Sequence, residues 1–303
     1  MRFAADFARS QGLALVPIGQ GSNIVLVNDL DAVVLRLNLQ GRAITGDRVF
    51  MAAGESWHEA VSWSLSENLY GLENLALIPG TVGAAPIQNI GAYGVELSDF
   101  VATVSVFDTL AGEEVTLQAS DCGFAYRQSR FQSEKNLLVT GLTVELSRKP
   151  SMCLTYPGLL DRMTEEGLSP NPHHIFDTIC KIRSEKLPDP VNQPNAGSFF
   201  KNPIVTREQA EELARRFPGL PVYPTPVDND LVKLSAAWLI EQAGLKHSSV
   251  GAFEVSGQHA LVIIHHGRGR TQDLLALVQQ VKALVQSNYG VVLEPEPGFL
   301  PAV

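Results

Sequence analysis

The chain has 303 residues, 45% of them hydrophobic and 18% charged, a composition that is ordinary for a globular protein of two or three domains. Its formal net charge of −9 argues against nucleic-acid binding, because nucleic-acid binders present a basic face. No run is apolar enough for membrane insertion, and three cysteines without a C-x-x-C pair predict neither a disulfide framework nor a metal site. These features favour a cytoplasmic protein. Apart from them, we expect a monomer whose partners are small molecules.

Helical periodicity opens the chain, on a face formed by Phe3, Ala4, Phe7 and Ala8, and Gly12 is a suitable C-cap. Short strands are predicted next over residues 13–17, 24–27 and 33–37. Because domains rarely begin within a structural element, we expect a strand to be missing before the first helix. Its loss would leave an unpaired sheet edge.

The middle of the chain alternates strands with helical segments. A strand from Arg48 precedes a helix with Ser56 as N-cap and Trp57, Val61 and Leu65 on its buried face. Residues 101–107 and 114–117 predict a hairpin, residues 137–146 a last strand of that sheet, and residues 175–182 a helix that ends near Lys186.

The last third predicts a small α/β unit. Thr206 and Gln209 form a capping-box pattern before a helix over residues 210–217. A second helix is expected at residues 234–242 and a strand at residues 260–264. A long final helix carries Leu274, Val278, Val281 and Val285 on one face.

The stretch of residues 71–97 is unusually rich in glycine and poor in charge. Gly80, Gly83, Gly91 and Gly94 leave its backbone N–H groups open to close approach, which suits phosphate oxygens. The alternative is a buried structural turn, but such a turn has no need of polar Thr81, Gln88, Asn89 and Tyr93. The stretch therefore predicts a phosphorylated cofactor.

A second glycine-rich segment, residues 19–23, lies between two predicted strands. It is either a simple β-turn or a loop whose N–H groups face a ligand. It is not a dinucleotide fingerprint, because Ile24 stands where the third glycine would be and a strand follows in place of a helix. Together with the longer stretch, it suits a diphosphate cofactor.

Three further segments carry candidate chemistry. In residues 195–203, Ser198 is either a helix cap or a proton donor, with Lys201 and Lys186 as possible cationic neighbours. In residues 124–131, Arg127 is either a surface residue of an amphipathic strand or a clamp for a carboxylate. Residues 293–297 form either a solvated acidic turn or a charge-stabilising site.

Together these segments resemble the UDP-N-acetylenolpyruvoylglucosamine reductase family nearly from end to end. The match is carried by residues 19–23, 78–97, 126–129, 186–190, 195–203, 233–244 and 293–296. The resemblance implies an α+β fold, in which a two-lobed FAD-binding domain of the PCMH (vanillyl-alcohol-oxidase-like) type is joined to a smaller α/β substrate-binding domain. We expect a first FAD lobe at residues 1–40, completed by residues 297–303, a second lobe at residues 41–185, and the substrate domain at residues 186–296.

The resemblance also implies the reaction. In this family NADPH reduces FAD, a hydride passes from flavin N5 to C3 of the enolpyruvyl ether, and UDP-N-acetylmuramate is formed for peptidoglycan synthesis. By resemblance Ser198 protonates C2, while Arg127 and Glu296 stabilise the enol-like intermediate. The implied FAD contacts are Ile18, Gly19, Gln20, Gly21, Ser22, Asn23, Pro79, Gly80, Thr81, Val82, Gly83, Ala84, Gln88, Asn89, Gly91, Ala92, Gly94 and Val95. The implied substrate contacts are Tyr126, Tyr156, Lys186, Asn202, Tyr223 and Lys233.

Some positions depart from the family pattern. Pro297 and Gly298 follow Glu296 where an apolar residue and an arginine are common, and His265 and His266 stand where an asparagine-like residue is usual. Two rival interpretations remain, another FAD-dependent oxidoreductase of the same fold and an inactive flavin-binding paralogue. The Ser198 loop and the Lys186 segment argue against the first. The second is weakened because Arg127, Ser198 and Glu296 are all present.

Overall fold

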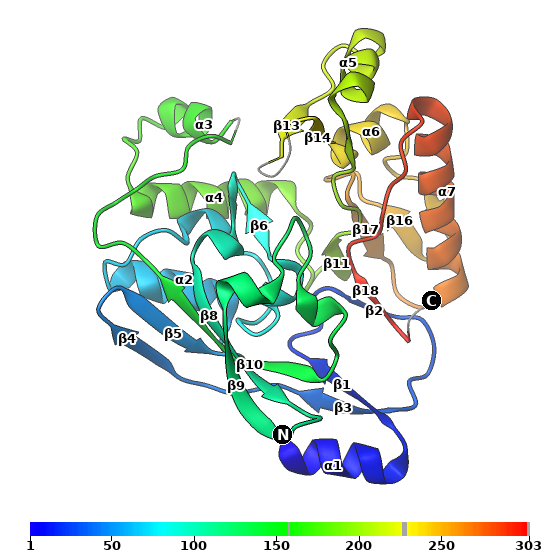
Figure 1. The fold of residues 1–303 in the computed structure, drawn as a ribbon. Helices are drawn as coiled ribbons and strands as arrows, with labels where there is room; N and C mark the ends of the chain where they lie inside the picture. Colours follow the sequence, from blue (N-terminus) through cyan, green and yellow to red (C-terminus); the bar gives the residue numbers. More distant parts are fainter. Residues whose placement is uncertain (157, 226–228, 302–303) are drawn as a thin grey trace. The chain divides into compact units, whose positions relative to one another are not determined.

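A computed structural model describes residues 1–156, 158–225 and 229–301 (Figure 1). The chain divides into two compact units. The first unit consists of Met1–Ser22 and Asp31–Glu185, and the second of Asn23–Leu30 and Lys186–Val303. The predicted division into three domains stays a prediction, because a division into two compact units does not show which residues bind FAD and which bind substrate. Residues 302 and 303 of the predicted closing segment lie outside the described residues.

The first unit combines helices with a five-stranded antiparallel sheet of order β4-β5-β10-β8-β9. Its α-helices are α1 (Arg2–Gln11), α2 (Trp57–Ser66), α3 (Leu159–Glu165) and α4 (Pro172–Lys186), the last residue of α4 belonging to the second unit. Its strands are β1 (Ala14–Ile18), β3 (Ala32–Arg36), β4 (Arg42–Thr45), β5 (Arg48–Ala52), β6 (Gly91–Ala92), β7 (Val95–Glu96), β8 (Val101–Asp108), β9 (Glu113–Gln118) and β10 (Leu137–Glu145). The predicted hairpin is confirmed, while β4 was not predicted and β10 lies at the centre of the sheet.

The buried faces of α2 and α4 pack with the inward residues of this sheet into one core. As predicted, Ser56 caps α2, its Oγ accepting a hydrogen bond from the backbone N–H of Glu59 at 3.5 Å. Trp57 is 1% exposed, and its Nε1 donates to the carbonyl of Leu75 at 2.9 Å. The core therefore ties the start of α2 to the glycine-rich stretch that follows it.

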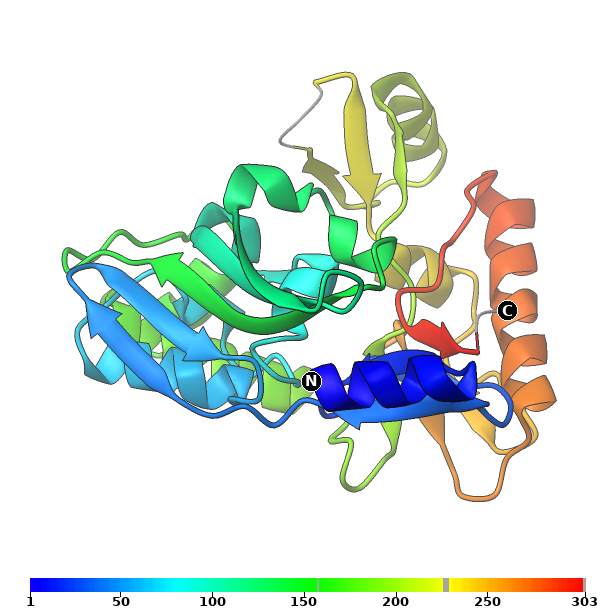
Figure 2. The ribbon, with the colours of Figure 1, turned by 60° about the horizontal axis from the view of Figure 1, so that its bottom comes forward.

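Helix α1 covers the parallel pair β1–β3, and the predicted C-cap at Gly12 is confirmed (Figure 2). Its buried residues are Ala5 and Ala8, whereas Phe3 is 84% exposed and stacks on Phe7 at 6.4 Å. The small alanine side chains let the helix approach the two strands closely, so the aromatic part of the predicted apolar face is turned outward.

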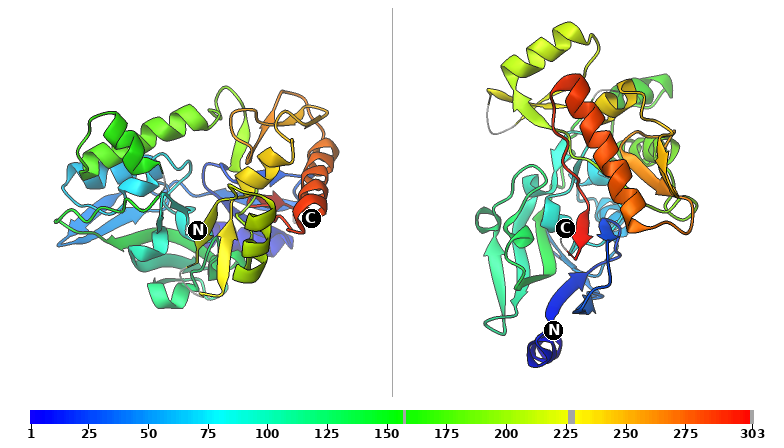
Figure 3. Two further views of the ribbon diagram at one scale, coloured as in Figure 1. Left: turned by 90° about the horizontal axis from the view of Figure 1, so that it is seen from above. Right: turned by 90° about the vertical axis from the view of Figure 1, so that its right-hand side faces the viewer.

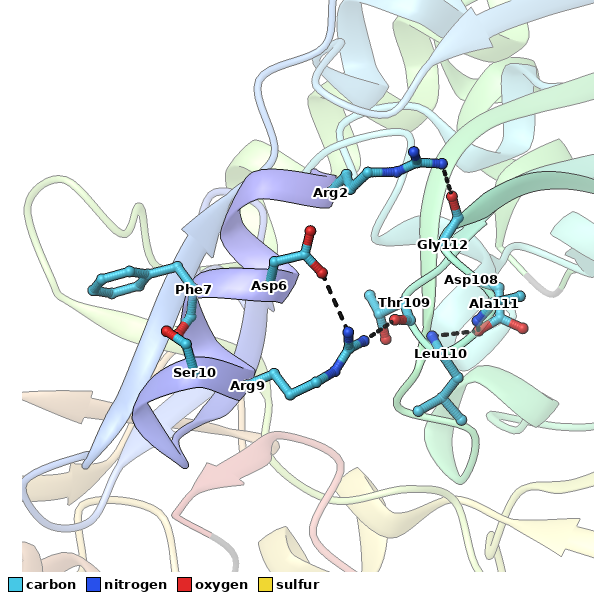
Figure 4. A network of polar contacts seen from close by, with 10 residues as sticks. All are labelled: Arg2, Asp6, Phe7, Arg9, Ser10, Asp108, Thr109, Leu110, Ala111 and Gly112. Atoms are coloured by element: carbon cyan, nitrogen blue, oxygen red, sulfur yellow. Dashed lines mark hydrogen bonds and ion pairs between the residues drawn. The ribbon is translucent and has the colours of Figure 1, made fainter.

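The same helix also holds the turn between β8 and β9 (Figure 4). Arg9 Nη2 donates to the carbonyl of Thr109 at 2.8 Å, and Arg2 donates to the carbonyl of Gly112. Asp6 forms an ion pair with Arg9 at 3.2 Å. These contacts join the β1–β3 pair to the five-stranded sheet within one unit.

The second unit contains three sheets and three α-helices around its own core (Figure 3). Its helices are α5 (Arg207–Arg216), α6 (Ala236–Gln242) and α7 (Thr271–Tyr289). Its strands are β2 (Ile24–Leu26), β11 (Asn195–Ser198), β12 (Ile204–Thr206), β13 (Val222–Pro224), β14 (Leu231–Leu234), β15 (Ser249–Val250), β16 (Phe253–Val255), β17 (Val262–His265) and β18 (Gly298–Leu300). The sheets have the orders β11-β17-β16-β15, β12-β14-β13 and β18-β2.

Most predicted elements of the second unit are confirmed. Leu274, Val278, Val281 and Val285 are buried along α7, and the Thr206 side chain caps α5 by accepting from Gln209 N at 3.2 Å. Helix α6 begins two residues later than expected, because the preceding residues pair as β14. In the described parts of the chain, no helix is long and apolar enough to cross a membrane.

The two histidines that depart from the family pattern have different surroundings. His266 Nε2 lies 2.7 Å from Glu254 Oε2, and His247 Nδ1 lies 2.9 Å from Glu254 Oε1. These hydrogen bonds, that of His266 first, hold the pKa of the Glu254 carboxyl below its usual value. His265 instead stacks on Phe253 at 4.7 Å.

Glu254→Gln tests this arrangement. Because the folded pKa is lowered, the carboxylate stabilises the fold above pH 4.5, the ordinary value, and loses that effect as the pH falls further. The unfolding free energy of the variant should therefore lie below that of the wild type at pH 7, and the two should converge in acid. Urea denaturation measures the difference, with exposed Glu211→Gln as a control. A gap that persists at low pH would contradict the assignment.

Candidate functional site

The two glycine-rich loops predicted to bind the cofactor meet in the first unit. A Cβ on Gly19 would lie 2.6 Å from Thr81 Oγ1, and one on Gly80 would lie 3.0 Å from Ser22 Oγ. Ser22 Oγ donates to the carbonyl of Pro79 at 3.2 Å. The loops of residues 18–22 and 79–84, hereafter the paired loops, therefore touch, and glycine is what permits the contact.

The paired loops carry backbone N–H groups that have no acceptor among the described residues. These groups belong to Gly19, Gln20, Gly21, Ser22, Gly80 and Thr81. Gly80 and Thr81 are buried, and buried N–H groups without a partner are rare in proteins. Backbone N–H groups on glycine-rich loops that have no protein acceptor can bind an anion, so the residues present fit the diphosphate of FAD.

The loop of residues 79–84 is fixed from behind by residues 53–57. Gly83 N donates to Ala53 O at 2.9 Å, and Val82 N donates to Glu55 O at 2.9 Å. Trp57 N donates to Gly80 O at 3.1 Å. Among the described residues, these hydrogen bonds use the N–H groups of Val82 and Gly83, whereas those of Gly80 and Thr81 have no acceptor.

The later part of the glycine-rich stretch forms the short hairpin β6–β7. The Asn89 side chain is buried beside it and donates to Glu96, Ser98 and the carbonyl of Ala125 at 3.0–3.1 Å. These contacts show a structural role for that amide. The predicted FAD contacts of Gln88, Asn89, Gly91, Ala92, Gly94 and Val95 stay predictions.

Arg127 lies against this hairpin. Its Nη2 donates to Gly91 O at 2.8 Å, and a Cβ on Gly91 would lie 3.0 Å from Arg127 Nη1. Its backbone is left-handed, with φ +54°, in a tight turn closed between Ala125 and Gln128. The alternative of an amphipathic strand is therefore wrong, and the turn holds the guanidinium beside the predicted cofactor loop.

The predicted substrate residues of the first unit lie near aromatic partners. The Arg127 guanidinium carbon is 5.1 Å from the centre of the Tyr126 ring. The Tyr156 ring packs edge-on against Tyr93, with centroids 4.8 Å apart. Neither contact tests the predicted binding roles.

Arg183 on α4 is a candidate that sequence reasoning missed. Its Nε donates to Leu77 O at 3.3 Å. Burial lowers the pKa of Arg183 and raises that of Tyr93, and no carboxylate of the described chain pairs with this guanidinium. Arg183 is one of many polar residues on α4, so no pattern in the sequence distinguished it from the others.

In the second unit, Ser198 ends strand β11 at a bulge. Asn195 pairs with Ile264 and Ser198 with Val262, so two residues of β11, Ala196 and Gly197, oppose the single Ile263 of β17 across the register shift. Gly197 takes φ +74°, and its N–H donates to Asn195 Oδ1 at 2.9 Å. The left-handed glycine re-aims Ser198 at the end of the strand, a common use of bulges.

Glu296 is brought next to this strand by backbone pairing. Glu296 N donates to Phe199 O at 2.9 Å, Lys201 N donates to Glu294 O at 3.0 Å, and Phe200 bridges Pro295. Glu296 thus lies opposite Phe199, the residue after Ser198, and the roles predicted for Ser198 and Glu296 stay predictions. Lys201 Nζ lies 3.7 Å from Glu294 Oε2, and its position three residues after Ser198 turns it to the opposite side of an extended segment.

The other predicted substrate residues lie on defined elements of this unit. Tyr223 on β13 is directly opposite Lys233 on β14, which places both on one face of their sheet. Asn202 Oδ1 accepts from Ala236 N at 3.0 Å at the start of α6, and Lys186 ends α4. No cluster of His, Cys, Asp and Glu in the described residues fits a metal ion.

Two family models match the chain. The UDP-N-acetylenolpyruvoylglucosamine reductase C-terminal domain model matches residues 189–300, and an FAD-binding domain model matches residues 2–118.

Curated relatives align over nearly the whole chain. UDP-N-acetylenolpyruvoylglucosamine reductase of Cupriavidus pinatubonensis (strain JMP 134 / LMG 1197) is 46% identical over 98% of this chain and 89% of its own length. The proteins of the same name from Pseudomonas aeruginosa (PAO1) and Xylella fastidiosa (strain 9a5c) are 44% identical, covering 99% and 96% of this chain and 90% and 85% of their own.

Among solved structures, the UDP-N-acetylenolpyruvylglucosamine reductase (MurB) of Thermus caldophilus aligns with a TM-score of 0.68. It shares 25% sequence identity, over 97% of this chain and 88% of that one.

Gly83→Ala tests the packing behind the paired loops. An added Cβ would lie 2.6 Å from Ala53 Cβ and 3.1 Å from Ala53 O, so overpacking should lower the unfolding free energy by about 1–3 kcal/mol. Thermal unfolding measures the loss. Gly298→Ala is the control, since its nearest atom would be 3.9 Å away, and equal losses in both variants would contradict the close packing.

Proposed function

The chain belongs to the UDP-N-acetylenolpyruvoylglucosamine reductase family, and we propose that it reduces the enolpyruvyl ether of UDP-N-acetylglucosamine to UDP-N-acetylmuramate with NADPH as reductant. As a member of this family it is a flavin-dependent oxidoreductase of peptidoglycan synthesis, and its cofactor is FAD. The unpaired N–H groups of the paired loops support the cofactor assignment. When bound, FAD supplies a hydride to C3 of the enolpyruvyl group.

Arg127 is proposed to stabilise the negative charge that hydride addition creates. That charge spreads over C2 and the neighbouring carboxylate of the substrate. A guanidinium keeps its charge at any working pH and can hold a carboxylate with two parallel hydrogen bonds. The left-handed turn and the Gly91 carbonyl restrict where this guanidinium can point, which lowers the entropy lost on binding.

Ser198 is proposed to donate the proton to C2, with Glu296 stabilising the enol-like intermediate. The observation that supports this assignment is the backbone pairing of Phe199 with Glu296, which brings the segments that carry Ser198 and Glu296 side by side. Proton transfer from a positioned group contributes to the rate only if that group is held near the reacting atom. The Gly197 bulge supplies such positioning for Ser198.

Tyr126, Tyr156, Lys186, Asn202, Tyr223 and Lys233 are proposed to contact the UDP-sugar. The Tyr223–Lys233 pair supports this assignment, since it offers a hydroxyl and an ammonium side by side on one sheet face. Cations gathered in a binding site attract an anionic substrate even when the net charge of the protein is −9.

One experiment separates the proposal from its rivals. The purified protein should show a bound-flavin spectrum that NADPH bleaches anaerobically and that UDP-N-acetylglucosamine-enolpyruvate restores. Restoration by oxygen but not by this substrate would favour another FAD oxidoreductase. Bound flavin that NADPH does not bleach would favour an inactive paralogue.

Ser198→Ala should slow turnover by about 10²- to 10⁴-fold, the usual contribution of a general acid. Reduction of the flavin by NADPH should be unchanged, because that half-reaction needs no proton at C2. Stopped-flow absorbance separates the two half-reactions. Exposed Ser249→Ala should turn over like the wild type, and an equal loss in both half-reactions for Ser198→Ala would refute the role.

Glu296→Gln tests whether proton sharing by this carboxyl matters. An amide cannot titrate, so the pH–rate profile of kcat should lose the limb that the carboxyl contributes. The profile is measured from steady-state rates over about five pH units, from about pH 5 to about pH 10. Glu294→Gln, two residues away, is the matched control, and an unaltered profile in Glu296→Gln would exclude the role.

A further inference from the structure

Glu55 is a buried carboxylate behind the paired loops that neither the reaction nor the comparisons assign. It is 7% exposed. Its Oε1 accepts from Gly41 N at 2.7 Å, and its Oε2 accepts from Arg42 Nε at 2.7 Å and pairs with Arg42 Nη2 at 2.6 Å. Both oxygens are therefore occupied, and the side chain is held in one orientation.

Arg42 is itself restrained on several sides. Its Nη1 donates to Glu59 O at 3.3 Å, and its guanidinium carbon lies 5.5 Å from the centre of the Trp63 ring. Two nitrogens of the guanidinium, Nε and Nη2, converge on the single oxygen Oε2, while Gly41 N holds Oε1, so the charge-assisted contacts fix the direction of the carboxylate. The pair thus fixes the backbone at Gly41, the residue before β4, relative to the segment before α2.

The backbone of Glu55 reaches one of the paired loops. Its carbonyl accepts from Val82 N, between the hydrogen bonds that Ala53 and Trp57 make to the same loop. Gly54 lies so close to the connection after β3 that a Cβ would be 2.5 Å from the carbonyl carbon of Asn38. Residues 53–57 are therefore held between that connection and the loop of residues 79–84.

The other side of the network reaches the second loop. Leu37 N donates to Ile18 O at 2.9 Å, where β1 leads into residues 18–22. From Leu37 the chain continues through Leu39, whose carbonyl accepts from Gly54 N at 2.8 Å, to Gly41 at the Glu55 carboxylate. Residues 37–41, through their hydrogen bonds to Ile18, Gly54 and the Glu55 carboxylate, thus link the two loops by way of residues 53–57.

We propose that Glu55, clamped by Arg42, is a positioning residue that sets the spacing of the two loops that bind FAD. It does so without belonging to either loop. This inference rests on the proposed cofactor, because the loops are its binding site. Its effect is on FAD affinity, since a misplaced loop loses hydrogen bonds to the diphosphate.

Release of FAD from the holoenzyme tests the inference. Glu55→Gln and Arg42→Met should each raise the Kd for FAD about tenfold or more, measured from the fluorescence of released flavin on dilution. Arg42→Lys, which keeps the charge but not the fork, should lie between Arg42→Met and the wild type. Glu166→Gln is the matched control, since Glu166 pairs with Arg162 and Lys181 on α3 and α4.

A merely structural role has a different signature. It would lower the unfolding free energy of these variants while the folded protein kept the wild-type Kd, and that result would overturn the proposal. If a variant does not fold, hydrogen exchange of the flavin-free wild type tests the proposal in its place. The N–H groups of Gly41 and Val82 should be protected before FAD is added, and protection that appears only with FAD would also overturn it.

A failure of the proposal for Glu55 can be distinguished from a failure of the proposed function. A wild-type protein that holds no flavin would refute the cofactor assignment. Wild-type protein that binds FAD tightly but does not reduce the enolpyruvyl ether would refute the reaction and leave the role of Glu55 standing.

Discussion

In the described part of the chain, the backbone N–H groups of the buried residues Gly80 and Thr81 have no acceptor, and this is the constraint on which the first unit depends. They exist because residues 53–57 use one side of the loop of residues 79–84 and leave Gly80 and Thr81 facing away. Their cost is the desolvation of donors with no partner, about 1–3 kcal/mol each. A bound diphosphate offsets that cost, so the same geometry that weakens the empty unit strengthens the occupied one.

In the second unit the main constraint is the backbone pairing of two segments that are far apart in the sequence, those of Ser198 and Glu296. Backbone pairing brings the segment of Glu296 beside that of Ser198, because Phe199 O accepts from Glu296 N across adjacent extended segments. Backbone hydrogen bonds fix register to within one residue, and a slip would turn either side chain to the other face. The bulge at Gly197 adds the local turn that a regular strand lacks.

Patterns in the sequence predicted most elements and both glycine-rich loops, because periodicity and glycine content are local properties. The contact between Gly19 and Thr81 could be inferred only as a shared ligand, since the two residues are far apart in the chain. Arg127 was ambiguous because a tight turn and an amphipathic strand have similar composition, and the φ of +54° decides between them. Glu55 and Arg183 carry no sequence signal, because their importance comes from burial and from partners elsewhere.

The parallel pairing of β2 with β18 has a consequence for how the protein is made. Residues Ile24–Leu26 leave the ribosome long before Gly298–Leu300, with which they pair. The second unit therefore cannot complete this pair until residues 298–300 have been made, and such non-local pairing is slow. Because β18 completes this pair, substitutions that disrupt its backbone hydrogen bonds should impair folding more than its three residues suggest.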